Sequence, residues 1–586
     1  MNSDNMIVVT IDNRTVAVPA GTTILNACKS AGIKIPTLCH LEEVSSNASC
    51  GICVVEVEGA KSLVRSCVQT VTSGMKIHTA TARVMRARKT VTELILANHP
   101  FECPTCLRSE SCELQALAAQ MGVTEQHFPQ TKKTVPTDFI GWGVMRDNNK
   151  CILCGRCVAV CREVQSVAAI DFAGRGIKTR IAPFMDKALS ESVCVSCGQC
   201  TVVCPTGALT ERDQTAEVFD MLHDPELTVV VQTAPAIRAS LGEELGMKDG
   251  SLVTGKMVTA LRRLGFNKVF DTQFTADLTI MEEGTELLHR LSNGGALPML
   301  TSCSPGWISF IETFYPDLVP HLSSCKSPQQ MFGSVAKTYW AEKAGVDPSK
   351  IVVVSIMPCT AKKFEAKRPE MRDAWKWWKE KGKKDSPYYD VDFALTTREL
   401  ARMIKRAGID FTSLPEEAFD NPLGESTGAA VIFGTTGGVM EAAVRTAYEV
   451  ATGTPLPKLE LEAVRGFNGI KSAALQVGDA TLKVAVAHTL KNARIILDEI
   501  AAGTSDYAFV EIMTCPGGCI GGGGQPVAPT WEKREKRKAA IYREDELLPL
   551  RKSHENPAIK TLYTEFFGKP LGHLSHELLH TEYRKR

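Results

Sequence analysis

The sequence predicts a multidomain α/β protein in which small cysteine-rich domains precede a larger α/β domain and a short helical segment ends the chain. With 586 residues, the chain is long enough for several domains. Most of its 21 cysteines lie before residue 205, in closely spaced groups. After about residue 228, short apolar runs alternate with helical patterns, which is the order expected for α/β layers built on parallel sheets.

Composition and charge exclude several classes of function. Hydrophobic residues make up 44% of the chain and charged residues 23%, as in ordinary globular proteins. A formal net charge of +1 argues against nucleic acid as the main partner. The start of the chain has no basic segment followed by an apolar core, and no apolar run approaches the length of a membrane span. We therefore expect a cytoplasmic protein with neither a membrane nor a nucleic-acid partner.

The cysteines indicate bound metal rather than disulfides, because a reducing compartment keeps thiols free. Nearly all of them fall into spaced groups or later motifs. Cys28 and Cys325 stand apart, and we interpret both as small buried hydrophobic residues.

The first cysteine group is expected in a domain spanning residues 1–80. An alternating pattern from residue 7 to 18 predicts a hairpin across Asp12-Asn13, followed by a short helix over 22–31 and a strand over 54–57. The candidate ligands are Cys39, Cys50, Cys53 and Cys67. Four thiolates beside a strand suit a [2Fe–2S] cluster, and the arrangement resembles a plant-type ferredoxin with a longer first spacing. A structural zinc site is the alternative.

A second cluster motif is expected in residues 81–135, after a helical pattern over 84–97. A histidine stands four residues before a C-x-x-C pair, close enough for its imidazole to complete a set of four ligands. The candidates are His99, Cys103, Cys106 and Cys112. They resemble the histidine-ligated [4Fe–4S] site of larger hydrogenases and of the large iron–sulfur subunit of respiratory complex I. The imidazole removes negative charge, which raises the cluster's potential.

Residues 136–215 carry the pattern C-x-x-C-x-x-C-x-x-x-C twice, which predicts a ferredoxin domain with two [4Fe–4S] clusters. The runs are Cys151, Cys154, Cys157 and Cys161, then Cys194, Cys197, Cys200 and Cys204. In two-cluster ferredoxins the fourth cysteine of each run binds the other cluster. We therefore expect Cys204 to complete the first cluster and Cys161 the second. Arg162 stands where a proline often follows, which leaves the number of ligands unchanged.

Residues 225–528 are predicted to form the α/β domain. The expected strands are 229–231, 351–355, 431–433, 484–487 and 509–513, and the expected helices are 254–264, 396–406 and 438–448. Cys303, Cys359 and Cys515 each follow an apolar run or its end. Open α/β sheets bind ligands at the carboxyl ends of their strands, so these three loops are expected to converge.

Three loops of this domain resemble the signature loops of the iron–iron hydrogenases, in the same order. They are Thr301-Ser-Cys-Ser-Pro-Gly-Trp307, Met357-Pro-Cys-Thr-Ala-Lys-Lys-Phe-Glu365 and Met513-Thr-Cys-Pro-Gly-Gly-Cys-Ile-Gly-Gly-Gly-Gly-Gln525. Over almost the whole chain, the sequence resembles the catalytic subunit of a multi-subunit, NADP-reducing type. The resemblance implies reversible oxidation of hydrogen at a [4Fe–4S] cube, linked through one cysteine to a two-iron unit with CO and cyanide ligands.

The resemblance also implies roles for individual residues. Cys359, Cys515 and Cys519 correspond to ligands of the cube, with Cys519 bridging to the two-iron unit. Lys362 corresponds to the residue that binds a cyanide through a charge-assisted hydrogen bond. The residues expected to line the pocket are Met357, Met513, Gln329 and Pro235.

The pair Cys303-Ser304 departs from the family pattern, which usually has two adjacent cysteines. By register, Cys303 is the proton-transfer residue and Ser304 stands where the fourth ligand of the cube is expected. An alkoxide is a harder and more basic donor than a thiolate. Either Ser304 binds the cube and lowers its potential, or Cys303 binds it and the proton step changes.

A proton path is indicated by spacing and by the resemblance. Glu283, Glu286 and Arg290 share one face of the helix predicted over residues 279–291. The relay implied by the family runs through Cys303, Glu283, Ser323, Glu286 and Arg290. A thiol, carboxylates and a hydroxyl can each accept and release a proton, so the order is chemically sound.

We expect electrons to pass from this chain to partner subunits. Neither G-x-G-x-x-G after a strand nor G-x-x-x-x-G-K-[ST] occurs, so we find no nicotinamide or flavin site. The resemblance implies a hetero-oligomer with flavin-binding, NAD(P)-binding and [2Fe–2S] partner subunits. Electrons would cross four accessory clusters, one [2Fe–2S] and three [4Fe–4S], and leave from the two N-terminal ones.

Two further segments have less specific patterns. Residues 375–384 are basic and aromatic, which favours a solvated helix, with a docking surface for a partner subunit as the alternative. Residues 529–586, with helical patterns over 532–544 and 557–567, resemble the small subunit of two-chain periplasmic hydrogenases. His573, His576 and His580 share a spacing there, but no cysteine or acidic set accompanies them, so we expect packing or surface roles.

Two other interpretations share parts of these patterns. The iron–sulfur subunit of a complex I-like dehydrogenase has the same first 210 residues but no use for Cys359, Cys515 or Cys519. A non-catalytic protein of the same fold is either a hydrogen sensor or an iron–sulfur assembly factor. Glu283, Glu286 and Lys362 favour an enzyme, whereas the departure at Ser304 keeps the hydrogen sensor as an alternative.

Overall fold

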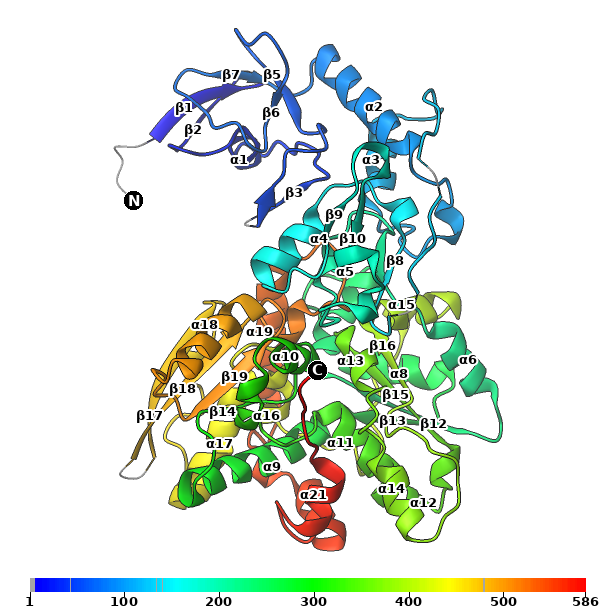
Figure 1. Ribbon diagram of the computed structural model, residues 1–586, viewed down its shortest axis with the longest axis vertical. Coiled ribbons are helices and arrows are strands. Elements are labelled where there is room, and N and C mark those ends of the chain that lie inside the picture. The colour runs from blue at the N-terminus through cyan, green and yellow to red at the C-terminus, as the bar shows by residue number, and fades with distance from the viewer. Residues whose placement is uncertain (1–5, 43, 133, 140, 478–479) are drawn as a thin grey trace.

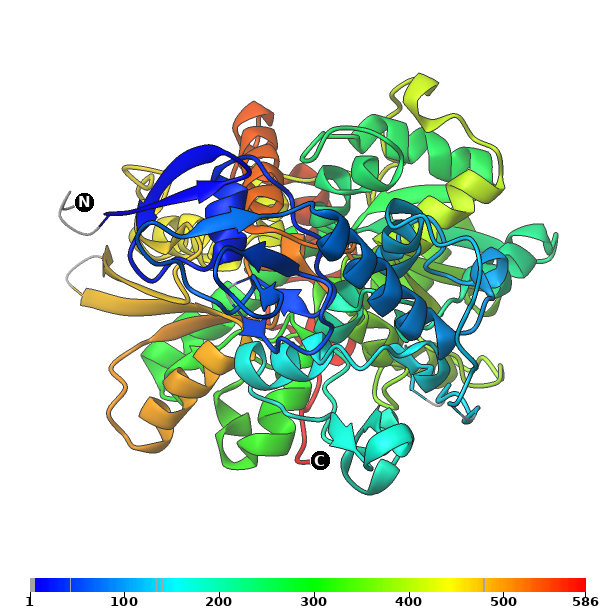
Figure 2. The same cartoon turned by 90° about the horizontal axis from the view of Figure 1, so that it is seen from above.

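The computed structural model describes residues 6–42, 44–132, 134–139, 141–477 and 480–586. Small cysteine-rich domains are stacked along the long axis above a larger α/β body (Figure 1). Seen along that axis, they overlie the body (Figure 2). Residues 1–5, on which part of the cytoplasmic interpretation depends, lie outside the described residues. No helix among the described residues combines the length and apolar character that a bilayer span requires.

The N-terminal domain is built on a five-stranded sheet of order β2-β1-β7-β5-β6. Its strands are β1 (Met6–Ile11), β2 (Arg14–Pro19), β5 (Val54–Val57), β6 (Val64–Arg65) and β7 (Lys76–His78). The β1–β2 hairpin turns at Asp12 and Asn13, both with positive φ, as a tight hairpin turn requires. Helix α1 (Ile24–Ser30) begins where the Thr23 hydroxyl accepts from the Asn26 amide. The predicted hairpin, helix and strand are confirmed.

The next segment leads to a two-fold repeat. Helix α2 (Ala82–Ala97) precedes α3 (Glu113–Gln120). In the repeat, β8 (Val144–Arg146) pairs with β11 (Leu209–Glu211), and each half has a short helix, α4 (Arg156–Ala159) or α5 (Gln199–Val203). Gly155 and Gly198 occupy the same place before these helices with φ of 76° and 70°, a conformation that glycine adopts without strain.

The large body contains two four-stranded sheets, of order β13-β12-β15-β16 and β14-β19-β18-β17. The first is entirely parallel and consists of β12 (Thr228–Thr233), β13 (Lys268–Asp271), β15 (Ile351–Met357) and β16 (Phe393–Thr396). The second consists of β14 (Met299–Leu300), β17 (Ile470–Val477), β18 (Ala480–His488) and β19 (Phe509–Met513), with only β17 antiparallel. The mostly parallel α/β architecture is as predicted.

One predicted strand is wrong. Residues 431–433 belong to α16 (Gly428–Val431) and to the 3₁₀ turn Ile432–Gly434 that follows it. Every residue from 428 to 434 is buried, so the segment shows no polar face. A short, wholly apolar run gives no periodicity that separates a buried helix from a buried strand.

Helices fill the space beside and between the sheets. The expected helices appear as α8 (Thr254–Leu264), α15 (Thr397–Arg406) and α17 (Gly438–Thr452). The long helix α9 (Thr272–Asn293) is buried over most of its length and packs against α11 (Pro328–Val335) and α17. It therefore carries acidic side chains into the interior, where water does not screen them.

The C-terminal segment packs onto the body through α19 (Trp531–Leu547), α20 (Pro557–Leu562) and α21 (His573–Leu579). Buried ion pairs hold α19: Arg238 contacts Glu544 at 3.1 Å, and Arg445 contacts Asp545 at 2.9 Å. The red α21 lies at the lower end of the body in Figure 1. The basic aromatic segment forms helix α14 (Asp373–Glu380), whose Trp377 is buried against the C-terminal segment.

Candidate active site and cluster-binding sites

A cavity lies where the three signature loops meet, between the two sheets of the body. The loops follow β14, β15 and β19 at the carboxyl ends of these strands. Five side chains from the loops line the cavity: Cys303, Ser304, Cys359, Cys515 and Cys519. The four expected pocket residues line it as well: Pro235, Gln329, Met357 and Met513. Residues up to 284 positions apart in sequence therefore share one enclosed, largely apolar site.

The glycines of the last loop allow it to pass close to neighbouring backbone. A Cβ atom on Gly522 would lie 2.0 Å from the carbonyl oxygen of Pro358, and one on Gly518 would lie 2.5 Å from the Thr436 amide. Gly518 also has φ of 91°, which disfavours any other residue. Positions 518 and 522 therefore accept only glycine. The loop brings Cys515 and Cys519 to the cavity that Cys359 also lines. Three convergent thiols in a glycine-lined cradle fit a bulky iron–sulfur cofactor.

Lys362 is held at the edge of this cavity. Its Nζ donates to the carbonyl oxygen of Cys303 at 3.1 Å and to Glu365 Oε2 at 2.9 Å. Glu365 also accepts from Ser327 and Gln329, so the carboxylate orients several cavity residues at once. Sequence reasoning missed Glu365, although its i+3 spacing from Lys362 in one helical turn was the available signal.

Ser304 lies in the cavity wall with its hydroxyl group bound to a neighbour. Ser304 Oγ lies 2.8 Å from Thr514 Oγ1, and the Thr514 amide points to the same oxygen at 3.4 Å. Burial raises the pKa of the adjacent Cys303 thiol well above its ordinary value, and the negative charge of Glu283 adds to the rise. Cys303 is thus a protonated thiol, beside a serine that pairs with Thr514.

The proposed relay residues lie together around α9. Glu283 is buried, and neither carboxylate oxygen has a hydrogen-bond partner among the described residues. Burial, reinforced by the charge of Glu286, raises the pKa of Glu283 to about 8. Ser323 Oγ donates to Glu286 Oε2 at 2.8 Å, and Arg290 Nη2 donates to Glu286 Oε1 at 2.6 Å. Arg290 also donates to the backbone carbonyl groups of Pro320 and Leu322.

The eight cysteines of the two-fold repeat form two separate groups. One cavity is lined by Cys151, Cys154, Cys157 and Cys204. A second is lined by Cys161, Cys194, Cys197 and Cys200. Each group contains the fourth cysteine of the other run, which is the exchange that two-cluster ferredoxins make. Four thiols around an enclosed apolar space fit a [4Fe–4S] cluster in each case.

The second of these groups contacts the active-site loops directly. Gln199 Nε2 donates to the Gly521 carbonyl oxygen at 2.9 Å, and Thr201 Oγ1 donates to that of Gly523 at 3.0 Å. A Cβ atom on Gly523 would lie 2.2 Å from the carbonyl oxygen of Cys197. The ferredoxin repeat and the cavity are therefore in backbone contact, which gives electrons a short route.

The two N-terminal cysteine groups converge on the first group of the repeat. Asn47 Nδ2, from the N-terminal domain, donates to the Cys154 carbonyl oxygen at 3.1 Å. Next to α3, the Glu113 amide donates to the Pro205 carbonyl oxygen at 2.9 Å. Both N-terminal cysteine groups thus lie in segments that contact the first group of the repeat.

His99 has the surroundings of a metal ligand. Its Nδ1 atom is buried and has no hydrogen-bond partner among the described residues. Burial lowers the pKa of His99 to about 4, so the ring is neutral near pH 7. A neutral imidazole with a free, buried nitrogen fits the histidine-ligated cluster expected with Cys103, Cys106 and Cys112. In the N-terminal domain, Cys39, Cys53 and Cys67 are buried and Cys50 is half-buried.

Comparison with known proteins agrees with this arrangement. Residues 227–523 match the family described as the iron only hydrogenase large subunit, C-terminal domain, and residues 531–586 match the iron hydrogenase small subunit. Residues 4–82 match a 2Fe-2S iron–sulfur cluster binding domain. Residues 88–127 match the NADH-ubiquinone oxidoreductase-G iron–sulfur binding region, and 141–210 match the ferredoxin-like domain of NADH-quinone oxidoreductase subunit 3.

Two relatives and one solved structure extend the comparison. The NADP-reducing hydrogenase subunit HndD of Solidesulfovibrio fructosivorans is 51% identical, covering 99% of both chains. Iron hydrogenase 1 of Clostridium pasteurianum is 42% identical over 96% of this chain and 97% of its own. An iron–iron hydrogenase structure from Chlamydomonas reinhardtii is 45% identical over 64% of this chain and 99% of its own, with a TM-score of 0.56. The chain therefore belongs to the iron–iron hydrogenase family.

Proposed function

We propose that this chain is the catalytic subunit of a hydrogenase that interconverts hydrogen with protons and electrons and delivers the electrons to partner subunits. The observation that carries this proposal is the convergence of Cys359, Cys515 and Cys519 on one enclosed cavity. Cys303 in that cavity lies near the buried carboxyl group of Glu283, and the ferredoxin repeat contacts the loop that carries Cys519. Hydrogen chemistry needs both outlets, one for protons and one for electrons.

The cavity residues would hold a [4Fe–4S] cube and a two-iron unit with CO and cyanide ligands. Cys359, Cys515 and Cys519 would bind the cube, with Cys519 shared by the two-iron unit and Ser304 in the fourth position. The two-iron unit supplies the open coordination position at which hydrogen is split or formed. Lys362 would bind a cyanide through a charge-assisted hydrogen bond, and Met357, Met513, Gln329 and Pro235 would exclude water. The lysine is already at the cavity wall.

Cys303, Glu283, Ser323, Glu286 and Arg290 would move protons between the cavity and the surface. The protonated thiol of Cys303 faces the cavity. Glu283, with a pKa of about 8, exchanges a proton near neutral pH without a large energy cost in either direction. Glu286 accepts hydrogen bonds from Ser323 and from Arg290, and Arg290 would be the outermost member of the path.

Electrons would leave through four accessory clusters, one [2Fe–2S] and three [4Fe–4S]. These lie in the first three of five proposed domains, which span residues 1–80, 81–135, 136–215, 225–528 and 529–586. The contacts that both N-terminal segments make with the first repeat group support two exits, one at the histidine-ligated cluster and one at the [2Fe–2S] cluster. We propose a cytoplasmic hetero-oligomer in which flavin-binding, NAD(P)-binding and [2Fe–2S] subunits take up these electrons. The similarity to an NADP-reducing hydrogenase subunit supports this assignment.

The test is hydrogen uptake by the protein matured with its two-iron unit. The isolated chain should reduce an artificial dye with hydrogen and should fail to reduce NAD(P) without partner subunits. Direct NADP reduction by the single chain would contradict the partner assignment. A fully matured protein that binds hydrogen without turnover would instead be a sensor.

A further inference from the structure

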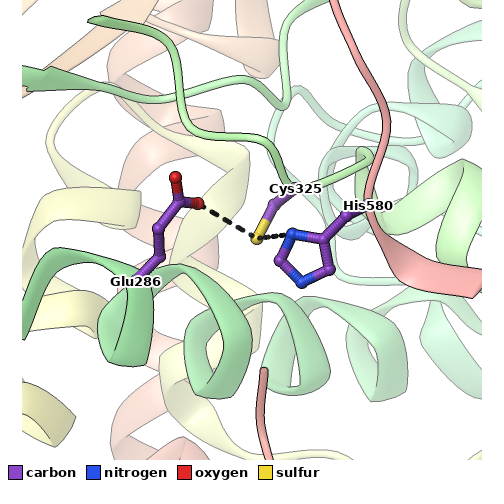
Figure 3. A group of neighbouring side chains, drawn as sticks. All are labelled: Glu286, Cys325 and His580. Atoms are coloured by element: carbon purple, nitrogen blue, oxygen red, sulfur yellow. Dashed lines mark hydrogen bonds between the residues drawn. The ribbon is translucent and has the colours of Figure 1, made fainter. Parts of the chain in front are cut away.

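A second cluster of metal-binding side chains lies beside the proposed proton path. It consists of Glu286 on α9, Cys325 on the segment before α11, and His580 directly after α21 (Figure 3). Cys325 Sγ lies 3.9 Å from Glu286 Oε2 and 3.9 Å from His580 Nδ1. All three residues are buried. No cysteine or acidic ligand set accompanies the three C-terminal histidines in the sequence, because the cysteine and carboxylate of this group come from segments more than 250 residues away.

The spacing of the three ligand atoms suits a tetrahedral metal ion. They all lie within 4.8 Å of one another. Zinc bonds of about 2.0–2.3 Å place tetrahedral ligand atoms roughly 3.3–3.7 Å apart, so the two sulfur contacts need shifts of a few tenths of an ångström and the third pair of atoms a shift of up to about an ångström. An imidazole, a thiolate and a carboxylate are the donors that zinc prefers, whereas calcium and magnesium require mainly oxygen.

The other nitrogen of His580 supplies independent evidence for a ligand. His580 Nε2 lies 3.1 Å from Glu282 Oε2, and both side chains are fully buried. Glu282 is fixed in turn by the Tyr563 hydroxyl at 2.5 Å and the Leu571 amide at 2.9 Å. A carboxylate on one nitrogen assigns the proton to Nε2 and directs the lone pair of Nδ1 toward Cys325. Metal-binding histidines are oriented by a carboxylate in this way.

One residue of the cluster borders a large cavity. His580 lines a cavity of about 950 Å³ together with Ser324 and His576, whereas Glu286 and Cys325 are buried and do not line it. The ring of His576 stacks on that of His580 at 4.9 Å between centroids, with the planes 4° apart. Ser324 Oγ lies 2.9 Å from His580 Nδ1, so an entering ion replaces one hydrogen bond of the hydroxyl.

We propose that Glu286, Cys325 and His580 form a Zn²⁺ site that closes the proton path. Binding replaces the proton of the Cys325 thiol, which leaves to solvent, and uses the thiolate, neutral imidazole and carboxylate, with a water molecule in the fourth position. The two anionic ligands balance the charge of the ion, as buried charges require. The carboxylate of Glu286 then no longer accepts a proton from Ser323. This inhibition rests on the proposed function, whereas zinc binding itself does not.

Binding is tested on the matured protein after removal of loosely held metal with a chelator and titration with ZnCl₂. We expect one tightly held zinc with a single sulfur ligand in X-ray absorption, and an unchanged iron content. Cys325→Ala and His580→Gln should each weaken it by at least the roughly 10–100-fold that loss of an outer partner causes. His554→Gln, in the separate Glu449–His554–Glu555 group, is the matched control and should retain it.

Inhibition is tested by hydrogen-dependent dye reduction, with each variant compared with its own zinc-free rate. Zinc should slow the wild-type protein and His554→Gln, and a chelator should restore the rate. Cys325→Ala and His580→Gln should need at least about tenfold more zinc. Zinc retention in both variants, or equal inhibition of all four proteins, would overturn the proposal. A protein without hydrogen turnover would contradict the proposed function, while the binding measurement would still decide the zinc site.

Discussion

Gln199 donates a hydrogen bond to the carbonyl oxygen of Gly521 at 2.9 Å, across the contact between the ferredoxin repeat and the active-site loop. Both residues are buried, and 322 positions separate them in the sequence. Gln199 lies between Cys197 and Cys200, and Gly521 lies two residues after Cys519. One hydrogen bond therefore joins the proposed ligand loops of two neighbouring clusters.

Replacing Gln199 should separate electron delivery from hydrogen activation. Gln199→Leu leaves the Gly521 carbonyl group buried without this donor, which costs about 1–3 kcal/mol and loosens the contact. We expect dye reduction to fall while hydrogen–deuterium exchange, which needs no electron to leave the site, is retained. The exposed Gln69→Leu is the control. Equal loss of both activities would place Gln199 in the hydrogen chemistry instead.

Glu283→Gln should stop proton transfer without emptying the active site. The amide keeps the size of the side chain but cannot carry a proton between Cys303 and Ser323. Loss of a proton-transfer group costs about 10²–10⁴-fold in rate. Cofactor content, measured by infrared absorption of the CO and cyanide ligands, should not change. A variant with near wild-type turnover would remove Glu283 from the path.

The same variant should reveal the raised pKa of Glu283 through stability. The folded protein holds a proton on Glu283 up to a pH of about 8, whereas the unfolded chain releases it near the ordinary value of 4.5. This contribution to stability is complete below 4.5 and is lost as pH rises toward 8. The thermal midpoint of the wild type minus that of Glu283→Gln should therefore fall between pH 5 and 8 and level off above. A constant difference would contradict the raised pKa.

The sequence predicts features encoded by short spacings and misses those made by distant segments. The eight cysteines of the repeat define their grouping by local pattern, and the structure places them in the two expected groups. The apolar run at 431–433 lacks such a pattern, and it proves helical. Cys325 stands alone in the sequence, so only folding reveals Glu286 and His580 beside it. Spacing carries information only within one element or loop.

Exchange of the fourth cysteines in the repeat predicts which cluster each substitution removes. Cys204→Ala should remove the cluster of Cys151, Cys154 and Cys157, although Cys204 lies only four residues after Cys200 in the sequence. Cys161→Ala should instead remove the cluster beside the active site. Iron and sulfide analysis with electron paramagnetic resonance distinguishes the two losses, against four accessory clusters in the wild type. Loss of the cluster of Cys194, Cys197 and Cys200 in Cys204→Ala would contradict the exchange.

The same iron and sulfide analysis tests the N-terminal domain. Zinc bound by Cys39, Cys50, Cys53 and Cys67 would contradict the [2Fe–2S] assignment.

Cys303→Ala separates the two roles open to this thiol. If Cys303 carries the proton, the variant should keep its cofactor while turnover falls by about 10²–10⁴-fold. If Cys303 binds the cube, the variant should lose or distort the cluster, which is visible in its paramagnetic resonance. Near-full activity with an intact cluster would exclude both roles.

Ser304→Cys tests the neighbouring position. The serine hydroxyl lies 2.8 Å from Thr514 Oγ1 in the cavity wall, and a thiol makes a weaker hydrogen bond there. If residue 304 binds the cube, a thiolate replaces a harder and more basic oxygen donor. The cube's potential should then rise while hydrogen turnover is retained, as measured by redox titration. Thr514→Val is the matched variant, because it removes the same hydrogen bond but leaves the oxygen donor in place. An unchanged potential in Ser304→Cys would show that residue 304 is not a ligand, and would leave Cys303 as the only side chain of this loop available to the cube.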